Sequence, residues 1–232
     1  MLRGRDSSTI ELAIQSVAEQ LVGWVSGRSW HSLTDEELHD TLVGCILSTA
    51  IRHETTVSIF DRLSRASLTP IRSRVSLDHW ENDVRSALAG RGPFGVDGPS
   101  HRFPNASARH LRRTYESLGR DLRSLRRILV EARSGKAARA RLMAVVSGFG
   151  PKQASSFLRN IGYCSDLAIL DVHVLRYMSY RRLCSGTVEA PRSLRDYEPL
   201  EDRLLAFSRG RGISLERFDI AIWIVMRSAA AA

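Results

Sequence analysis

Apolar residues recur at intervals of three and four along most of this 232-residue chain. One such stretch, residues 8–25, places five apolar side chains on one face of a helix: Ile10, Ile14, Val17, Leu21 and Val25. We find no run that alternates as a half-buried strand does, and no internal repeat. The spacing therefore predicts an all-α protein.

Local signals mark where several of these helices begin and end. Thr34 and Glu37 form the S/T-x-x-E pattern of a capping box, which predicts a helix start. Gly90 is placed to terminate a helix that begins near residue 77. Two stretches rich in glycine, proline or polar residues, 90–105 and 185–199, are predicted to be long loops. Further helices are predicted over residues 55–63, 106–119, 121–135, 136–148 and 213–227.

Residues 147–163, SGFGPKQASSFLRNIGY, read as helix end, tight turn and helix. Gly148 and Gly150 allow positive φ on both sides of Phe149, whose ring can fill the gap between the two helices. We therefore expect a helix–hairpin–helix over about residues 141–163. Such a turn exposes backbone N–H groups at the start of the second helix, where an anion is favoured, so it can hold a DNA phosphate. The alternative is a packing hairpin without a ligand.

The net charge of +9 and a pI near 10.3 point to a polyanionic partner. DNA or RNA is the first candidate, an anionic membrane surface the second, and a merely soluble surface remains an alternative. The arginines of the helices between residues 106 and 135 are most simply a solvated face, and the alternative is that some of them contact phosphate. Arg52 and His53, which follow the second helix, are further candidates for contact with DNA.

Lysine is rare here: the chain holds two lysines, Lys136 and Lys152, against 32 arginines. A guanidinium group cannot lose its proton and so cannot act as a nucleophile, whereas an amine can. A partly desolvated lysine near a helix N-terminus can attack carbon and form a Schiff base. Lys152, directly after the glycine-rich turn, is the candidate nucleophile, and Lys136 is expected to be an ordinary surface residue.

A lysine that attacks a sugar carbon also needs a nearby anion, which stabilises the positive charge that develops there. Asp171 follows an apolar run and is the candidate carboxylate. It is equally placed to be the N-cap of a helix that starts at Val172, and both roles can hold. His173 is either a structural histidine or a participant.

Other classes of protein are less compatible with the sequence. No segment approaches the ~18 uninterrupted apolar residues that span a bilayer, and the N-terminus lacks the apolar core of a signal peptide. We therefore expect an intracellular protein of the cytoplasm or nucleoid. Cys45, Cys164 and Cys184 are isolated, which predicts neither a disulfide framework nor a metal or iron–sulfur site. No cofactor is expected.

The combination of GFGPKQASSFLRNIGY with LAILDVHVLR resembles the helix–hairpin–helix DNA glycosylase superfamily. Within it, the chain resembles the compact archaeal-type 8-oxoguanine DNA glycosylase/AP lyases. Three further stretches are similar to that family's early helix pair, its R-F-x-N segment and its C-terminal helix: GCILSTAIRHETTVSIFDRL, HRFPNASARHLRR and FDIAIWIVM. The resemblance extends over roughly residues 35–226.

This resemblance implies that Lys152 is the nucleophile and Asp171 the essential carboxylate. It implies two helical lobes, residues 1–34 with 165–232 and residues 35–164, and a cleft between them that holds double-stranded DNA and a flipped base. It also implies a base pocket on the last helix, formed by Phe218, Asp219 and Trp223. We expect the protein to be a monomer. The backbone of the DNA is expected at five residues: Gly148, Phe149, Gly150, Arg52 and His53.

The expected activity is that of a bifunctional DNA glycosylase/AP lyase. The enzyme extrudes 8-oxoguanine from the duplex, Lys152 displaces the base to form a Schiff base, and β-elimination then cleaves the strand. One alternative is the same chemistry on another modified guanine or on an abasic site. The other is a non-catalytic DNA-binding module, in which Lys152 contacts a phosphate and Asp171 only caps a helix.

Overall fold

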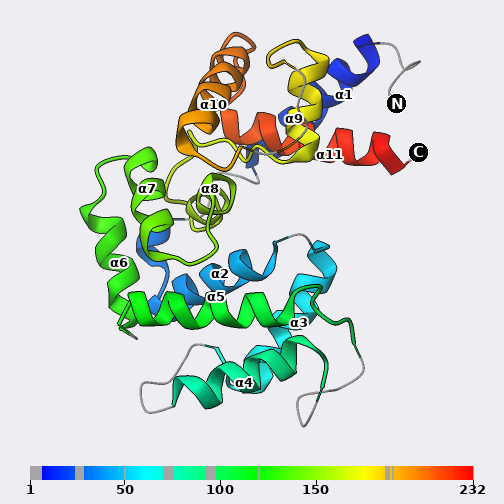
Figure 1. The fold of residues 1–232 in the computed structure, drawn as a ribbon. Coiled ribbons are helices and arrows are strands. Elements are labelled where there is room, and N and C mark those ends of the chain that lie inside the picture. The colour runs from blue at the N-terminus through cyan, green and yellow to red at the C-terminus, as the bar shows by residue number, and fades with distance from the viewer. Residues whose placement is uncertain are drawn as a thin grey trace. The chain divides into compact units, whose positions relative to one another are not determined.

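A computed structural model describes residues 7–23, 29–49, 51–69, 76–91, 98–119, 121–185, 189 and 191–231. Within these ranges every regular element is a helix, which confirms the all-α prediction (Figure 1). The chain divides into two compact units, residues 1–29 with 162–232 and residues 30–161.

The unit of residues 30–161 is built around helix α2. Its elements are η2 (Trp30–Ser32), α2 (Asp35–Leu47), α3 (His53–Arg65), α4 (Leu77–Leu88), α5 (Pro104–Ser117), α6 (Leu122–Glu131), α7 (Gly135–Val145) and α8 (Pro151–Asn160). Helix α2 packs against α3, α5, α6 and α8, and Leu38, Leu42 and Leu47 are almost wholly buried. Because its apolar residues are buried against four other helices, α2 is the centre of the unit.

The capping box predicted at the start of α2 is present. The Thr34 hydroxyl accepts a hydrogen bond from the Glu37 N–H at 3.1 Å, and the Glu37 carboxylate accepts one from the Thr34 N–H at 2.7 Å. Two of the N–H groups that a helix start leaves unpaired are thus satisfied. The predicted end of α4 is also confirmed, because Gly90 follows it with a φ of +66°.

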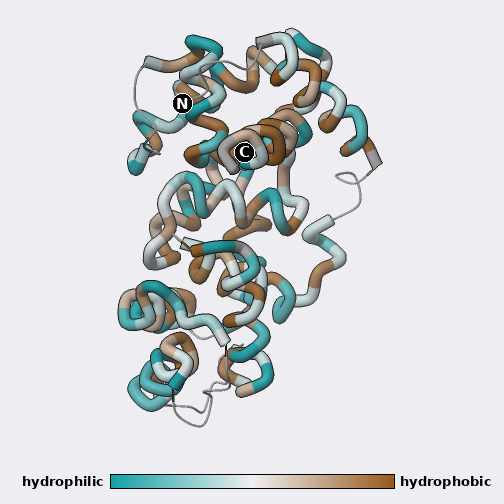
Figure 2. Tube along the Cα trace, turned by 90° about the vertical axis from the view of Figure 1, so that its right-hand side faces the viewer, coloured by the Kyte–Doolittle hydropathy of each residue, from teal (hydrophilic) through white to brown (hydrophobic). Residues whose placement is uncertain are grey.

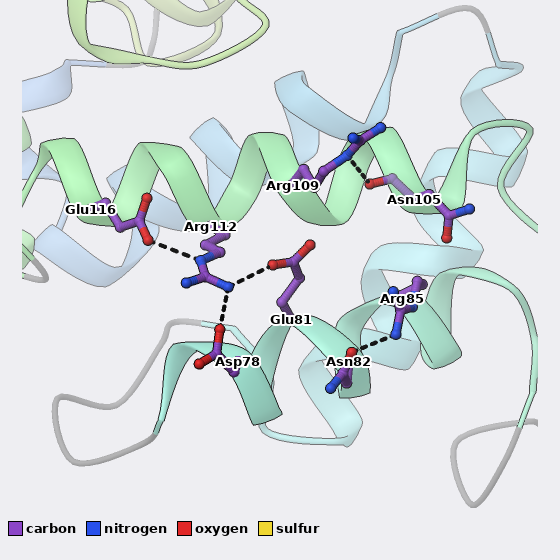
Figure 3. A network of polar contacts seen from close by, with 8 residues as sticks. All are labelled: Asp78, Glu81, Asn82, Arg85, Asn105, Arg109, Arg112 and Glu116. Carbon is purple, nitrogen blue, oxygen red and sulfur yellow. Dashed lines mark hydrogen bonds and ion pairs between the residues drawn. The ribbon is translucent and has the colours of Figure 1, made fainter.

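A polar network joins α4 to α5 on the surface of this unit (Figure 3). The Arg112 guanidinium of α5 donates to Asp78 and Glu81 of α4 and, at 2.9 Å, to Glu116. Hydrogen bonds to the three carboxylates raise the pKa of Arg112 further above its usual value. Ion pairs at the surface of a protein contribute little to its stability.

The unit of residues 1–29 and 162–232 is built around helix α11. Its elements are α1 (Ser7–Gln20), η1 (Leu21–Gly23), α9 (Val172–Tyr180), α10 (Leu194–Arg209) and α11 (Leu215–Ala231). Helix α11 packs against α1, α9 and α10, and Ile14, Leu175 and Phe218 belong to the core between them. Brown and teal residues alternate along most helices in Figure 2, as expected where one face is buried.

The prediction of a loop over residues 185–199 was wrong at its C-terminal end. Helix α10 begins at Leu194, after Ser193, whose hydroxyl accepts a hydrogen bond from the Asp196 N–H at 3.2 Å. Pro199 lies inside this helix. In the other predicted loop, residues 92–97 lie outside the described residues, and α5 begins at Pro104. None of the helices in the described ranges has the length and apolar character needed to cross a membrane.

Candidate functional site

The turn between α7 and α8 forms the predicted hairpin. Gly148 has a φ of +84°, as predicted for a left-handed position. Gly150 differs from the prediction: its φ of −99° and ψ of −179° are extended, because it is the N-cap of α8. Phe149 is 8% exposed, and its ring centre lies 6.4 Å from that of Phe157. The phenylalanine therefore fills the space inside the turn.

Two residues of helix α5 contact this turn. A Cβ atom at position 148 would lie 2.9 Å from Cγ of His110, so the imidazole rests directly on the glycine. His110 Nδ1 lies 3.0 Å from the Ser147 hydroxyl, and the Thr114 hydroxyl accepts a hydrogen bond from the Ser147 N–H at 3.1 Å. Sequence reasoning missed His110 and Thr114, because they belong to an arginine-rich helix that we interpreted as a solvated face.

The start of α8 is open toward an anion. Pro151 is its first residue and has no N–H group, and Gly150 has no side chain with which to cap the helix. The first intrahelical bond runs from the Ala154 N–H to the Gly150 carbonyl at 3.1 Å. The N–H groups of Lys152 and Gln153 therefore point out of the helix end, where its dipole favours negative charge.

Lys152 is half-buried in the first turn of α8. Further along this helix, the Asn160 side-chain amide lies 3.8 Å from the Cys45 sulfur of α2. Burial raises the pKa of the Cys45 thiol to about 12, against the opposing effects of Asn160, Ser156 and the positive charge of Lys152. The thiol is therefore protonated at neutral pH.

Asp171 is the N-cap of α9, as one of its two expected roles required. Its Oδ1 accepts hydrogen bonds from the N–H groups of His173 and Val174, both at 2.9 Å. Because both bonds go to Oδ1, Oδ2 is left for other partners. The catalytic role of Asp171 stays a prediction.

The three residues predicted to form a base pocket lie in different surroundings on α11. Phe218 is 1% exposed and packs edge-on against Tyr177, with ring centres 5.9 Å apart. Asp219 is 2% exposed, and its Oδ2 accepts a hydrogen bond from the Ile169 N–H at 2.8 Å. Trp223 is 37% exposed, and the Arg227 guanidinium lies 4.9 Å from its ring centre. Of the three side chains, that of Trp223 is the one that a ligand can reach. Pocket roles for Phe218 and Asp219 stay predictions.

The candidate residues fall into two groups by unit. Gly148, Phe149, Gly150 and Lys152 share the unit of residues 30–161, whereas Asp171 and the residues of α11 belong to the other unit. Arg52 and His53 also lie in the unit of residues 30–161, where Arg52 is the N-cap of α3 and His53 its first residue. Among the described residues no three His, Cys, Asp or Glu side chains are grouped as metal ligands would be.

Comparison with known proteins gives consistent matches over most of the chain. The model of a protein family described as 8-oxoguanine DNA glycosylase matches residues 26–213. Proteins named 8-oxoguanine DNA glycosylase/AP lyase from Methanocaldococcus jannaschii and Korarchaeum cryptofilum are 27% and 29% identical to this chain. These matches cover 84% and 83% of this chain, and 83% and 81% of the two relatives.

The fold is also similar to that of solved structures. The crystal structure of the 8-oxoguanine DNA glycosylase of M. jannaschii superposes with a TM-score of 0.70 at 23% identity, covering 93% of this chain and 92% of the other. A second structure of the M. jannaschii glycosylase/lyase, in complex with a 15mer DNA containing 8-oxoguanine, gives a TM-score of 0.66 at 23% identity, covering 93% and 88%. These likenesses show the fold.

Proposed function

Because this chain belongs to the 8-oxoguanine DNA glycosylase family, we propose that it excises 8-oxoguanine from double-stranded DNA and then cleaves the strand as an AP lyase. The observation that carries the proposal is the family match over residues 26–213, which includes Lys152 and Asp171. The relatives named as 8-oxoguanine DNA glycosylase/AP lyases support both activities.

In the proposed reaction Lys152 Nζ attacks C1′ of the damaged nucleotide. The bond from C1′ to the base breaks, and the base leaves with the bonding electrons and takes up a proton. Asp171 stabilises the positive charge that develops on the sugar, through the oxygen that does not cap α9. The sugar ring then opens to give a Schiff base on Lys152. Loss of a C2′ proton expels the 3′ phosphate, and water releases the lysine.

We assign the grip on the DNA backbone to the hairpin. Its open helix end presents N–H groups to a phosphate, and Phe149, buried inside the turn, keeps them in place. Arg52 and His53, at the start of α3, are the second proposed contact. Contacts of this kind are independent of base sequence, which suits an enzyme that must search any duplex.

For the extruded base we propose stacking on Trp223. Its ring is partly exposed, and an aromatic face is the usual platform for a flipped base. Phe218 and Asp219, the other two predicted pocket residues, are buried on the same helix, α11. Extrusion costs a few kcal/mol of unstacking, which stacking of the base on the tryptophan partly offsets.

The two lysines provide a direct test of this proposal. Lys152→Arg keeps the charge and removes the nucleophile, so strand cleavage of a duplex with one 8-oxoguanine should vanish while DNA binding persists. Lys136→Arg is the matched control and should cleave as the wild type does. Cleavage by Lys152→Arg at the wild-type rate would refute the proposal. Cleavage by the wild type of an abasic duplex only would preserve the lyase and refute the base specificity.

A further inference from the structure

The segment that leads into Asp171 is held in an unusual way. The N–H groups of three successive residues each donate to a side chain rather than to another backbone carbonyl. Ala168 donates to Glu201 Oε1 at 2.9 Å, Ile169 to Asp219 Oδ2 at 2.8 Å and Leu170 to the Tyr197 hydroxyl at 2.9 Å. The Tyr197 hydroxyl in turn donates to the Ala168 carbonyl at 2.7 Å. We call Tyr197, Glu201 and Asp219 the cradle.

All three cradle side chains are buried. Tyr197 and Glu201 are one turn apart on α10 and 0% exposed, and Asp219 of α11 is 2% exposed. Burying a carboxylate is costly unless hydrogen bonds satisfy it. Two of the three acceptors are side-chain carboxyl oxygens and the third is a hydroxyl oxygen, and all three bonds are between 2.8 and 2.9 Å long. A segment outside the regular helices is thus fixed from two helices, in a unit whose described elements contain no sheet to pair with it.

The cradle ends where Asp171 begins. The Asp171 N–H donates to the Ile169 carbonyl at 2.8 Å, and its Oδ1 caps α9. The residue is therefore constrained from both sides, by the cradle before it and by the helix after it. A shift of residue 170 would break hydrogen bonds to buried side chains. Buried polar groups that lose their hydrogen-bond partners destabilise the folded protein.

We propose that Tyr197, Glu201 and Asp219 are positioning residues for Asp171, and this rests on the catalytic role proposed for Asp171 above. They set the place of the carboxylate relative to the sugar without touching the substrate. An active-site group must be held to within about 0.5 Å, and a displacement of about 1 Å can reduce a rate about a hundredfold. Asp219 acquires in this way a role distinct from the predicted contact with the base.

The experiment compares Tyr197→Phe with Tyr177→Phe. Tyr197→Phe keeps the ring and removes both hydrogen bonds to the segment. Tyr177 is a matched control, because it is a buried tyrosine of the same unit whose hydroxyl donates to Glu11 instead, at 2.9 Å. Single-turnover excision of 8-oxoguanine should fall about tenfold or more in Tyr197→Phe, with DNA affinity within about twofold, and should stay near wild type in Tyr177→Phe. Glu201→Gln, which keeps an acceptor, should lose less.

A double-mutant cycle separates positioning from stability. In the Asp171→Asn background, Tyr197→Phe should lower the residual rate no further, because the residue through which it acts is already disabled. An equal loss in both backgrounds would overturn the proposal, and so would a Tyr197→Phe variant with wild-type excision. Amide hydrogen exchange at residues 168–170 gives a readout independent of activity. If the wild type excises nothing, the proposed function fails, and protection lost at 168–170 in Tyr197→Phe alone still supports the cradle, whereas unchanged protection overturns it.

Discussion

Two separate features of the structure require glycine at position 148. Its φ of +84° lies in the left-handed region that side chains disfavour, and the His110 ring leaves no room for a Cβ atom. The second requirement comes from a residue 38 positions earlier in the chain (148 − 110), so that the hairpin depends on its contact with α5. The turn that we propose to hold phosphate is thus fixed by a contact that the motif itself does not contain.

Gly148→Ala tests this contact. We expect the variant to lose roughly 1–3 kcal/mol of stability from the backbone strain alone, and more from the clash with His110. Gly119→Ala is the control, since Gly119 has a φ of +69° and a Cβ atom added to it would meet nothing within 4 Å. Urea unfolding should show the larger loss for Gly148→Ala, and adding His110→Ala should recover part of it. Equal losses for the two glycines would show that the ring contact is unimportant.

Among the elements, α2 packs against four other helices of its unit, and it begins at a capping box. Thr34→Ala removes the hydroxyl that accepts the Glu37 N–H, and should cost about 1 kcal/mol of unfolding free energy. Thr34→Ser keeps the acceptor and should stay close to the wild type. Denaturant unfolding of both variants checks this prediction; a Thr34→Ala protein as stable as Thr34→Ser would contradict it.

The helices that sequence reasoning predicted and the one that it missed differ in their buried faces. Periodicity works for α2, whose buried positions are mainly apolar. The buried face of α10 consists of Tyr197, Glu201, Leu204 and Ser208, so its polar members hide the apolar stripe, and Pro199 suggests a loop. Glu201 is buried because it binds the segment before Asp171, a partner 33 residues away.

The candidate site divides in the same way. Lys152 and Asp171 could be proposed from local patterns and from the family resemblance, because each sits beside a recognisable turn or helix start. The residues that support them could not. His110 and Tyr197 act through contacts with segments distant in sequence, and a single sequence contains no signal for such pairings.

Three histidines of one unit make the stability of the whole protein depend on pH. Burial lowers the pKa of His39, His101 and His110 below the usual 6.5. His39 and His101 each also bond to a backbone carbonyl, of Leu122 and Leu47 respectively, which raises their pKa, but the effect of burial is the larger. The folded protein therefore binds these protons less readily than the unfolded chain does.

The sign of the pH effect follows directly. Their contribution to stability is complete above about pH 6.5 and is lost as the pH falls toward the lowered pKa values. We expect the urea midpoint to drop between about pH 7.5 and about pH 5.5, and to drop less in His101→Gln, which cannot titrate. A midpoint that stays level or rises on acidification would contradict the assignment of these histidines as neutral.

DNA binding by itself cannot establish the function of this molecule. With a net charge of +9 the protein is expected to bind any duplex through its phosphates, whether or not it is an enzyme. The decisive property is a covalent bond between Lys152 and the sugar. Borohydride reduces a Schiff base to a stable covalent bond, so that the trapped protein–DNA complex can be quantified.

The most direct measurement is therefore borohydride trapping on a duplex that carries one 8-oxoguanine, with wild type, Lys152→Gln and Lys136→Gln side by side. We expect a covalent complex with the wild type and with Lys136→Gln, none with Lys152→Gln, and none on an undamaged duplex. Trapping that persists in Lys152→Gln, or a folded wild-type protein that binds the damaged duplex and is never trapped, would contradict it.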